Sequence, residues 1–396
     1  MSDATRLTQA GDLQGATAAI QAALRMPAAT TAANRSNDQA FVIDVEAREV
    51  NEASPGHRLP APMNVPQVAR PAVVPAEGRF VRGRHADAAG ERNYKLYVPP
   101  SISGQPLPLP LVVMLHGCTQ DADDFALGTG MNDAAMEQGF FVLYPEQTQN
   151  ANAQRCWNWF KHNHQGRGRG EPALLAGMTR AIIEEYGIDP SRVYVAGLSA
   201  GGAMAAILGD AYPDLFAAVG VHSGLRSGAA TDVTSAFAAM QGGASGVAAA
   251  TGLGALPGLR GIGKSHAMPP AKSQGNRPMR EGGAIPTIVF HGDRDSTVHP
   301  VNGEQVIAAS MDSGVEASGV PAAKHERGRS AAGREYTRGL HRDAHGRVLS
   351  EHWVVHGAGH AWSGGRARGS YTDPQGPDAT QEMVRFFLSN ARPSAH

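Results

Sequence analysis

The stretch from Val193 to Gly202, V-Y-V-A-G-L-S-A-G-G, constrains the fold of this chain more than any other. Its β-forming residues lead into a G-x-S-x-G pentapeptide followed by small residues. This pattern predicts a buried strand, a sharp turn at Ser199 and a helix that starts near Gly201. Glycines at both ends of the pentapeptide leave room for a strained serine between two closely packed backbones. The preceding strand matters, because the pentapeptide alone also fits a plain Gly/Ser turn in a chain with 48 glycines.

The same turn suits a nucleophile. A serine hydroxyl is weakly nucleophilic at neutral pH, so its oxygen must project from a fixed point where a histidine can take its proton. The backbone N–H of Ala200 would lie at the start of the helix, where it can stabilise a negatively charged oxygen. We therefore expect Ser199 to be a nucleophile and Ala200 to be one donor of an oxyanion hole.

The composition limits the classes of function. Lysine and arginine total 35 against 36 acidic residues, a net charge of -1 without a long basic run, so we expect no nucleic-acid partner. No apolar run reaches the length of a membrane span. The first residues lack a basic segment followed by an apolar core, so we expect a cytoplasmic protein unless a precursor segment was removed. Two cysteines form neither a disulfide scaffold nor a zinc site without histidines, and we expect no metal and no cofactor.

Composition shifts divide the chain into segments. We expect 1–27 to form an amphipathic helical segment and 28–78 to form an extended, Ala- and Pro-rich linker. The catalytic domain would cover 79–392 and contain a Gly- and Ala-rich insertion at 225–283 that is a candidate lid. The N-terminal stripe is a candidate for weak docking on a hydrophobic granule surface or for self-association.

Strand and helix patterns alternate after Arg79. Two runs with period-two alternation first predict a pair of antiparallel strands. Apolar runs of strand length then alternate with helical segments, namely P-L-V-V-M-L-H-G, G-F-F-V-L-Y-P, V-Y-V-A-G-L and T-I-V-F-H-G. This order predicts the α/β class and an α/β-hydrolase fold, with a mostly parallel central sheet and helices on both faces.

An acid and a histidine follow the serine in the order that this fold requires. Asp293 and Asp295 come directly after one strand, and His356 and His360 follow the next. We expect Asp295 to be the acid, because it lies where the chain has turned back toward the histidine, whereas Asp293 caps the turn. We expect His360 to be the base, because its Gly-rich approach lets the imidazole reach over the edge of the sheet.

The second donor of the oxyanion hole comes from the loop after the strand L-V-V-M-L-H-G. Cys118 is placed to supply it through its backbone, and a cysteine nucleophile at this position is the rival interpretation. A disulfide between Cys118 and Cys156 would pin an aromatic loop beside the oxyanion hole, whereas a reducing cytosol argues against it. The sequence leaves the bridge open.

Several stretches together resemble the polyhydroxybutyrate depolymerase family of esterases over roughly residues 79–390. They are L-H-G-C-T-Q at 115–120, C-W-N-W-F at 156–160, R-G-R-G-E at 167–171, G-L-S-A-G-G at 197–202, V-F-H-G-D-R-D-S-T-V-H-P at 289–300 and G-H-A-W-S-G-G at 359–365. The resemblance implies a serine esterase that acts on polyesters of short hydroxyacids or on small esters such as feruloyl esters. It also implies Ser199 as nucleophile, Asp295 as acid, His360 as base, and Cys118 and Ala200 as oxyanion donors.

The substrate is not fixed by the resemblance. Trp157, Trp159 and Trp362 lie in loops next to the serine and are candidates for an apolar substrate cleft, although tryptophans also close a core beneath a loop. We expect hydrolysis of short polyhydroxyalkanoate chains or oligomers. The alternatives are a feruloyl or acetyl esterase, an amide hydrolase with the same triad, and a granule-binding protein without activity.

Overall fold

The computed structural model describes most of the chain after the expected linker. The described residues are 78–100, 108–242, 285–311, 324–343 and 346–393. The expected segments 1–27 and 28–78, apart from residue 78, lie outside the described residues, and so does 243–283 of the expected insertion. The first part of this insertion, residues 225–242, is described and contains one short helix.

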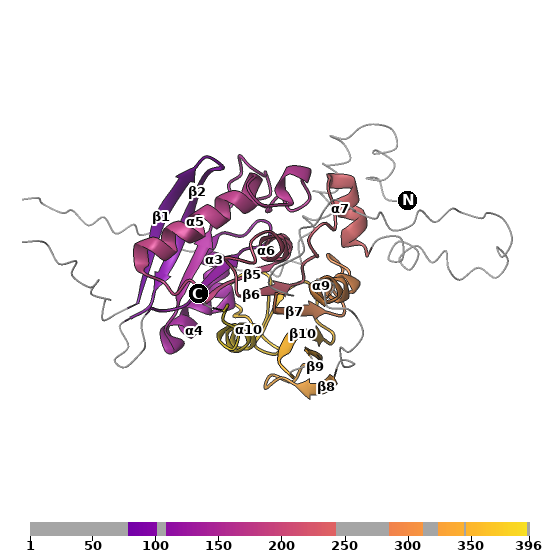
Figure 1. The fold of residues 1–396 in the computed structure, drawn as a ribbon. Coiled ribbons are helices and arrows are strands. Elements are labelled where there is room, and N and C mark those ends of the chain that lie inside the picture. The colour runs from indigo at the N-terminus through magenta and orange to yellow at the C-terminus, as the bar shows by residue number, and fades with distance from the viewer. Residues whose placement is uncertain (1–77, 101–107, 243–284, 312–323, 344–345, 394–396) are drawn as a thin grey trace, which may run out of the picture. The chain divides into compact units, whose positions relative to one another are not determined.

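A ten-stranded sheet forms the centre of the described part (Figure 1). Its strand order is β1-β2-β4-β3-β5-β6-β7-β10-β9-β8. The strands are β1 (Arg79–Asp87), β2 (Gly90–Val98), β3 (Leu111–Leu115), β4 (Phe141–Pro145), β5 (Val193–Leu198), β6 (Ala218–His222), β7 (Thr287–Gly292), β8 (Lys324–Arg329), β9 (Glu335–Arg342) and β10 (Val348–Val355).

The six central strands, from β4 to β10 in that order, are parallel to one another. Antiparallel pairs extend both edges, β1 and β2 on one side and β9 and β8 on the other. The expected mostly parallel sheet with two leading antiparallel strands is therefore confirmed.

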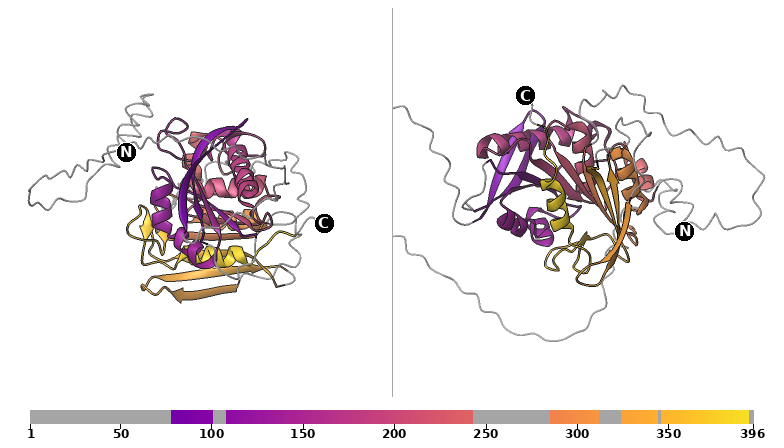
Figure 2. Two further views of the ribbon diagram at one scale, coloured as in Figure 1. Left: turned by 90° about the vertical axis from the view of Figure 1, so that its left-hand side faces the viewer. Right: turned by 60° about the horizontal axis from the view of Figure 1, so that its bottom comes forward.

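Helices cover both faces of the sheet (Figure 2). They are α3 (Ala122–Thr129), α4 (Met131–Gln138), α5 (Gly170–Tyr186), α6 (Ala200–Ala211), α7 (Val233–Met240), α9 (Val301–Met311) and α10 (Ala379–Leu388). Buried side chains of α5, α6, α7 and α9 belong to one hydrophobic cluster, and those of α3, α4 and α10 belong to the other.

Strand β3 shows why the sheet needs cover on both sides. All five of its residues are buried. Leu111, Val113 and Leu115 pack in the first cluster, whereas Val112 and Met114 pack in the second. Side chains alternate between the faces of a strand, so a continuous apolar run requires a helical layer on each face.

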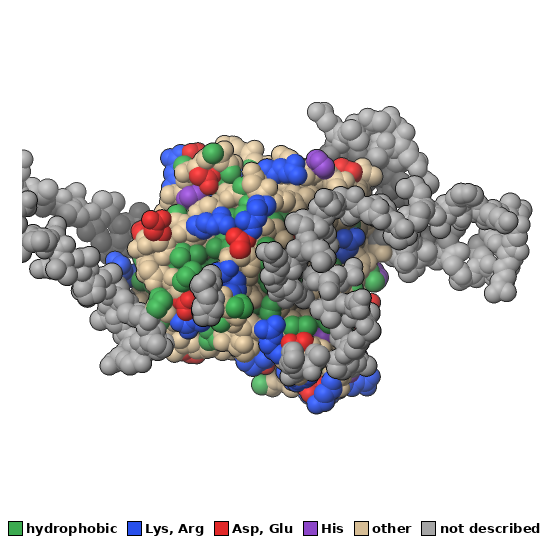
Figure 3. Space-filling model, in the orientation of Figure 1, with side chains coloured by type: hydrophobic (Ala, Val, Ile, Leu, Met, Phe, Trp, Pro, Cys, Tyr) green, Lys and Arg blue, Asp and Glu red, His purple; other side chains and the backbone are tan. Residues whose placement is uncertain are grey.

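The described surface carries mixed charge. In the view of Figure 3, basic and acidic side chains are interspersed. Several ion pairs form among the described residues, for example between Arg167 and Asp214. Within the described ranges, none of the helices has the length and hydrophobicity that crossing a bilayer would require.

The parallel order places the loops of interest together. Strands β5, β6, β7 and β10 are consecutive neighbours, and their carboxyl ends meet at one edge of the sheet. We call this edge, with the loops that follow β3, β5, β6, β7 and β10, the catalytic edge. A two-stranded sheet of β11 (Trp362–Ser363) and β12 (Thr372–Asp373) follows β10 there.

Candidate active site

Ser199 occupies a sharp turn between β5 and α6. Its backbone has φ 57° and ψ -119°, and its N–H donates to the carbonyl of His222 at 2.9 Å. A Cβ atom at Gly201 would lie 2.0 Å from the Leu115 carbonyl oxygen, and one at Gly197 would lie 2.4 Å from the Gly201 carbonyl carbon. Only glycine fits at either position. The strained serine is thus held by its neighbours with its side chain on the catalytic edge.

Asp295 and His360 form a hydrogen-bonded pair on the same edge. Nδ1 of His360 lies 2.7 Å from Oδ2 of Asp295, which is only 4% exposed. The other carboxylate oxygen accepts the N–H groups of Thr297 and Val298 at 2.9 Å each. Nε2 of His291 lies 3.4 Å from Oδ2.

These contacts decide the charge of the acid. Burial by itself would raise the pKa of Asp295, but hydrogen bonds from His291, His360 and the Val298 N–H outweigh burial and lower the pKa well below its usual range. The carboxylate is therefore ionised at neutral pH. It accepts the Nδ1 proton of His360, so Nε2 of that ring is left as a base.

Ser199 and His360 are not hydrogen-bonded to each other. Ser199 Oγ forms no hydrogen bond within the described part of the chain, and neither does Nε2 of His360. Bonds of this kind are often long in a site without substrate and shorten when the substrate is bound. The two side chains share one edge because β5 and β10 are separated only by β6 and β7.

A second Asp–His pair links the same two loops. Nδ1 of His356 lies 2.9 Å from Oδ2 of Asp293, and Oδ1 of Asp293 accepts the Gly357 N–H at 2.6 Å. Nε2 of His356 lies 2.8 Å from Thr337 Oγ1 on β9. Asp293 was expected to cap its own turn. Instead it joins the loop after β7 to the loop after β10, a contact between residues far apart in sequence that the turn pattern does not reveal.

This second pair borders a polar cavity. The cavity has a volume of about 440 Å³ and is lined by Ala332, Gly333, Arg334, Glu335, His356, Gly357 and Gln375. Arg334 donates from Nη2 to Gln375 Oε1 at 2.9 Å and to Asp373 Oδ1 at 3.1 Å. We assign Asp293 and His356 a positioning role, because they fix the spacing of the two loops that carry the first pair.

Two backbone N–H groups next to Ser199 have no hydrogen-bond partner among the described residues. Ala200 is the first residue of α6, where an N–H has no acceptor in its own helix. The N–H of Cys118 donates to no acceptor within the described residues. A Cβ atom at the preceding Gly117 would lie 3.7 Å from Cβ of Ser199, so this loop passes beside the serine.

Buried side chains fix the loop that carries Cys118. Gly117 donates its N–H to Gln120 Oε1 at 2.9 Å. His116 donates from Nδ1 to the Gly117 carbonyl at 2.7 Å and accepts the Gln147 N–H at Nε2 at 3.1 Å. Burial lowers the pKa of His116 to about 4, so the ring stays neutral with this one tautomer.

A disulfide joins this loop to the aromatic segment. Cys118 and Cys156 are bonded, with their Cα atoms 4.2 Å apart. The thiol of Cys118 is consumed in this bond, which removes the rival interpretation of Cys118 as a nucleophile. The backbone donor of Cys118 is tied by the same bond to the segment that begins at Cys156.

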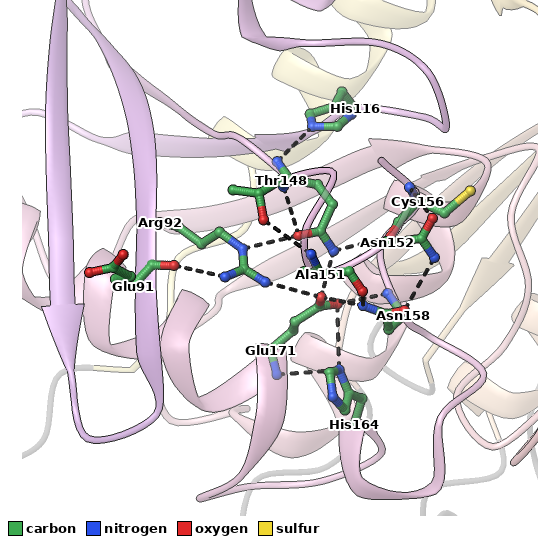
Figure 4. Close-up of polar contacts among 11 residues, drawn as sticks. Glu91, Arg92, His116, Thr148, Ala151, Asn152, Cys156, Asn158, His164 and Glu171 are labelled. Atoms are coloured by element: carbon green, nitrogen blue, oxygen red, sulfur yellow. Dashed lines mark hydrogen bonds and ion pairs between the residues drawn. The ribbon is translucent and has the colours of Figure 1, made fainter. Parts of the chain in front are cut away.

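Glu171 organises the segment after Cys156 (Figure 4). Its carboxylate is 3% exposed and accepts the N–H and the Nδ2 of Asn158 at 2.7 Å each. Gln147 donates both to this carboxylate and to the Cys156 carbonyl oxygen. Nη2 of Arg92 lies 3.4 Å from Oε1 of Glu171, and Nδ1 of His164 lies 3.5 Å from Oε2.

The surroundings of Glu171 keep it charged. Burial alone would raise its pKa, but hydrogen bonds from His164, Gln147 and the Asn158 N–H lower the pKa below its usual value. The sequence offers Glu171 only as the last letter of R-G-R-G-E. Its partners come from three other stretches, so the motif alone does not reveal that it anchors the disulfide loop.

The three tryptophans differ from expectation. Trp157, Trp159 and Trp362 are 0%, 5% and 1% exposed, so none presents a surface to a substrate. Trp362 stacks on the His222 ring at 5.0 Å and donates from Nε1 to Thr380 Oγ1 at 3.0 Å. The expected apolar cleft of indoles is therefore replaced by a packing role. The sequence places these rings in the right loops but does not give their direction.

The disulfide leads to a first prediction. Denatured, unreduced protein is expected to contain no free thiol. Cys156→Ser is expected to lower the free energy of unfolding by about 4 kcal/mol, since a bridge closing a loop of 38 residues restricts the unfolded chain. Denaturant unfolding followed by fluorescence measures the loss.

The matched control is the double variant. Cys118→Ser combined with Cys156→Ser should be no less stable than either single variant, because both remove one shared bond. Two free thiols in the unreduced protein would contradict the bridge.

Residues 92–330 match the family described as "Esterase PHB depolymerase". Poly(3-hydroxyalkanoate) depolymerase C of Paucimonas lemoignei is 36% identical over 206 residues, which cover 52% of this chain and 45% of that protein. Feruloyl esterase B of Thermothelomyces thermophilus is 34% identical over 142 residues, covering 36% of this chain and 47% of the relative.

The chain thus matches less than half of the length of these curated relatives. Among solved structures, an acetyl xylan esterase from Aspergillus awamori superposes with a TM-score of 0.53 at 19% identity. The superposition covers 78% of this chain and 99% of that one. At this identity the likeness concerns the fold.

Proposed function

Because the chain belongs to the esterase PHB depolymerase family, we propose that it is a serine esterase that hydrolyses carboxylic esters through an acyl-enzyme. One observation carries the proposal. Ser199 lies in a strained turn on the sheet edge where an ionised Asp295 holds His360 with Nε2 available as a base. We assign these three residues the roles of nucleophile, acid and base.

Acylation follows from the geometry. Ser199 Oγ attacks the ester carbonyl carbon while Nε2 of His360 takes the hydroxyl proton. The carbonyl oxygen becomes an oxyanion and accepts hydrogen bonds from the N–H groups of Cys118 and Ala200. As the tetrahedral intermediate collapses, the bond from carbon to the alcohol oxygen breaks and His360 returns its proton to that oxygen. The alcohol leaves, and the acyl group stays on Ser199.

Deacylation repeats these steps with water. His360 takes a proton from water as the water oxygen attacks the acyl carbon. The bond from carbon to Ser199 Oγ then breaks, and Oγ recovers the proton from His360. The ionised Asp295 stabilises the imidazolium in both halves of the reaction, and it keeps Nε2 as the working nitrogen.

We propose short polyhydroxyalkanoate chains or oligomers as the substrates. The support is the family match and the similarity to a poly(3-hydroxyalkanoate) depolymerase. The similarity to a feruloyl esterase makes small aromatic or acetyl esters the alternative.

The proposed function has a direct test. Rates are measured on para-nitrophenyl esters of increasing acyl length, on 3-hydroxybutyrate trimers and on a para-nitroanilide with the acyl group of the best ester. We expect the ester to be hydrolysed at least about 10³-fold faster than its matched anilide, because nitrophenolate leaves the tetrahedral intermediate without protonation, whereas the aniline nitrogen must first gain a proton. Comparable rates on both would support an amidase instead.

The disulfide bears on the compartment. Cytosolic thiol systems keep such cysteine pairs reduced, so we propose an oxidising compartment in place of the cytoplasm that the first residues suggest. Binding of a granule surface or self-association through segment 1–27 is also a proposal, and it concerns residues outside the described part of the chain.

A further inference from the structure

Backbone strain is concentrated at the catalytic edge. Five non-glycine residues of the described chain have positive φ, between 48° and 66°, and they are Thr119, Arg155, Ser199, Ser223 and Tyr371. Four of them belong to the loops already discussed, after β3, before Cys156, after β5 and after β6. Such conformations persist only where the surroundings enforce them, and they gather at ligand-binding sites. Tyr371 is the fifth, and it lies outside those loops, directly before β12.

The small sheet brings the backbone of Tyr371 level with the residue that follows His360. β11 and β12 are parallel, with Trp362 opposite Thr372. The preceding residues, Ala361 and Tyr371, are therefore level with each other, and Ala361 directly follows His360. The N–H of Trp362 donates to the Tyr371 carbonyl at 2.7 Å and fixes this level.

The same loop is anchored to the oxyanion side. Ser370 donates its N–H to Asp124 of α3 at 2.8 Å. Gln120 donates from Nε2 to the Ser370 carbonyl at 3.2 Å and also to Asp124 at 2.9 Å. Tyr371 is therefore held between the loop of the base and the loop of the oxyanion donor, although it is 47% exposed.

The hydrogen bonds of Thr119 determine whether the Tyr371 hydroxyl donates or accepts. Thr119 Oγ1 lies 2.6 Å from the Cys118 carbonyl oxygen, and a carbonyl only accepts, so Thr119 donates its one proton there. The Tyr371 oxygen lies 3.2 Å from Thr119 Oγ1. Because the Thr119 proton is already used, Tyr371 must donate to Thr119. The phenol oxygen then keeps lone pairs that can accept a hydrogen bond, on a side chain that is partly exposed.

We propose that Tyr371 is a specificity-determining residue that accepts a hydrogen bond from a substrate hydroxyl close to the scissile ester; this rests on the proposed function. Ester oxygens carry no proton and gain nothing from such an acceptor. Esters with a hydroxyl near the reacting carbonyl are therefore favoured over their plain counterparts. That hydroxyl can lie on the acyl side, as at the free end of a hydroxyacyl chain, or on the alcohol side.

The test compares matched esters on the full chain. The acyl-side pair is para-nitrophenyl 3-hydroxybutyrate and para-nitrophenyl butyrate, and the alcohol-side pair is 2-hydroxyethyl butyrate and ethyl butyrate. Within each pair, the specificity ratio is kcat/KM for the hydroxyl ester divided by kcat/KM for the plain ester. Tyr371→Phe keeps the ring and removes the acceptor, so we expect the ratio to fall about 3- to 10-fold in one of the two pairs. The pair that responds identifies the side on which the hydroxyl binds.

The control is Tyr186→Phe, the same chemical change at the last residue of α5, on the opposite edge of the sheet. Its ratios should match those of the wild type. Melting temperatures of both variants show whether either has lost its fold. Ratios that stay unchanged in Tyr371→Phe, or an equal loss on all four esters, would overturn the proposal and leave only a structural role. A wild type that hydrolyses none of the esters would overturn the proposed function together with it.

Discussion

Ser199→Ala is expected to lower kcat/KM for para-nitrophenyl butyrate by at least about 10⁴-fold, with the melting temperature nearly unchanged. Without Oγ there is no atom to carry the acyl group, and the rest of the site retains only binding and oxyanion stabilisation. The small side chain also fits the turn, since Ser199 forms no side-chain hydrogen bond within the described residues whose loss would cost stability. Steady-state kinetics measure kcat/KM, and thermal unfolding measures the melting temperature.

Ser389→Ala is the matched control for this variant. Ser389 caps the end of α10, away from the loops of the catalytic edge, and should retain wild-type rates. If Ser199→Ala kept more than a few per cent of the activity, the nucleophile would have to be another residue. Cys118 is not available for that part, because its sulfur is in the disulfide.

Asp295→Asn is expected to lower kcat by about 10³- to 10⁴-fold. The two N–H donors of Thr297 and Val298 would hold the amide oxygen where Oδ1 now lies. The amide NH₂ would then face Nδ1 of His360. A donor in this place favours the tautomer with the proton on Nε2, and that nitrogen could no longer accept the serine proton.

Asp293→Asn is the matched comparison, because it changes the same group two residues away on the same loop. Its partner His356 has no position next to the reacting serine in the proposed mechanism, so we expect a loss of less than about 10-fold, through looser spacing of the loops. The kcat of the two variants is measured side by side on one ester. If Asp293→Asn were the inactive variant and Asp295→Asn the active one, our assignment of the acid would be incorrect.

Much of this architecture could be predicted from local patterns. The β-forming residues before Ser199 predict its strand. The glycines around the serine predict the close approach of two backbones that the structure shows. Helix α5 ends before Gly187, whose left-handed backbone at φ 62° is a local stop signal that glycine supplies. Asp295 and His360 follow from the order of strands, because parallel neighbours deliver their carboxyl ends to one edge.

Other features depend on contacts between distant segments. The partners of Glu171, the pair Asp293 and His356 and the contact of Tyr371 with Thr119 each join stretches that no local pattern connects. Strand β8 and the β11–β12 pair were not expected either, because β8 is mostly charged and the other two have two residues each. A residue type in a loop predicts the location of a side chain better than its direction. For this reason the sequence placed the three tryptophans in the right loops but did not reveal that their side chains are buried.

The strand order also has a kinetic consequence. The bridge between Cys118 and Cys156 closes a local loop. The pairing of β3 with β5 also involves only residues before Ser199, so it does not require the C-terminal part of the chain. The loop that carries His360 is held only when β10 inserts between β7 and β9. Contacts of this sequence separation form slowly, because the chain entropy of closing long loops must be overcome first. Hydrolytic competence would thus be the last property to return on refolding, later than the secondary structure around the serine.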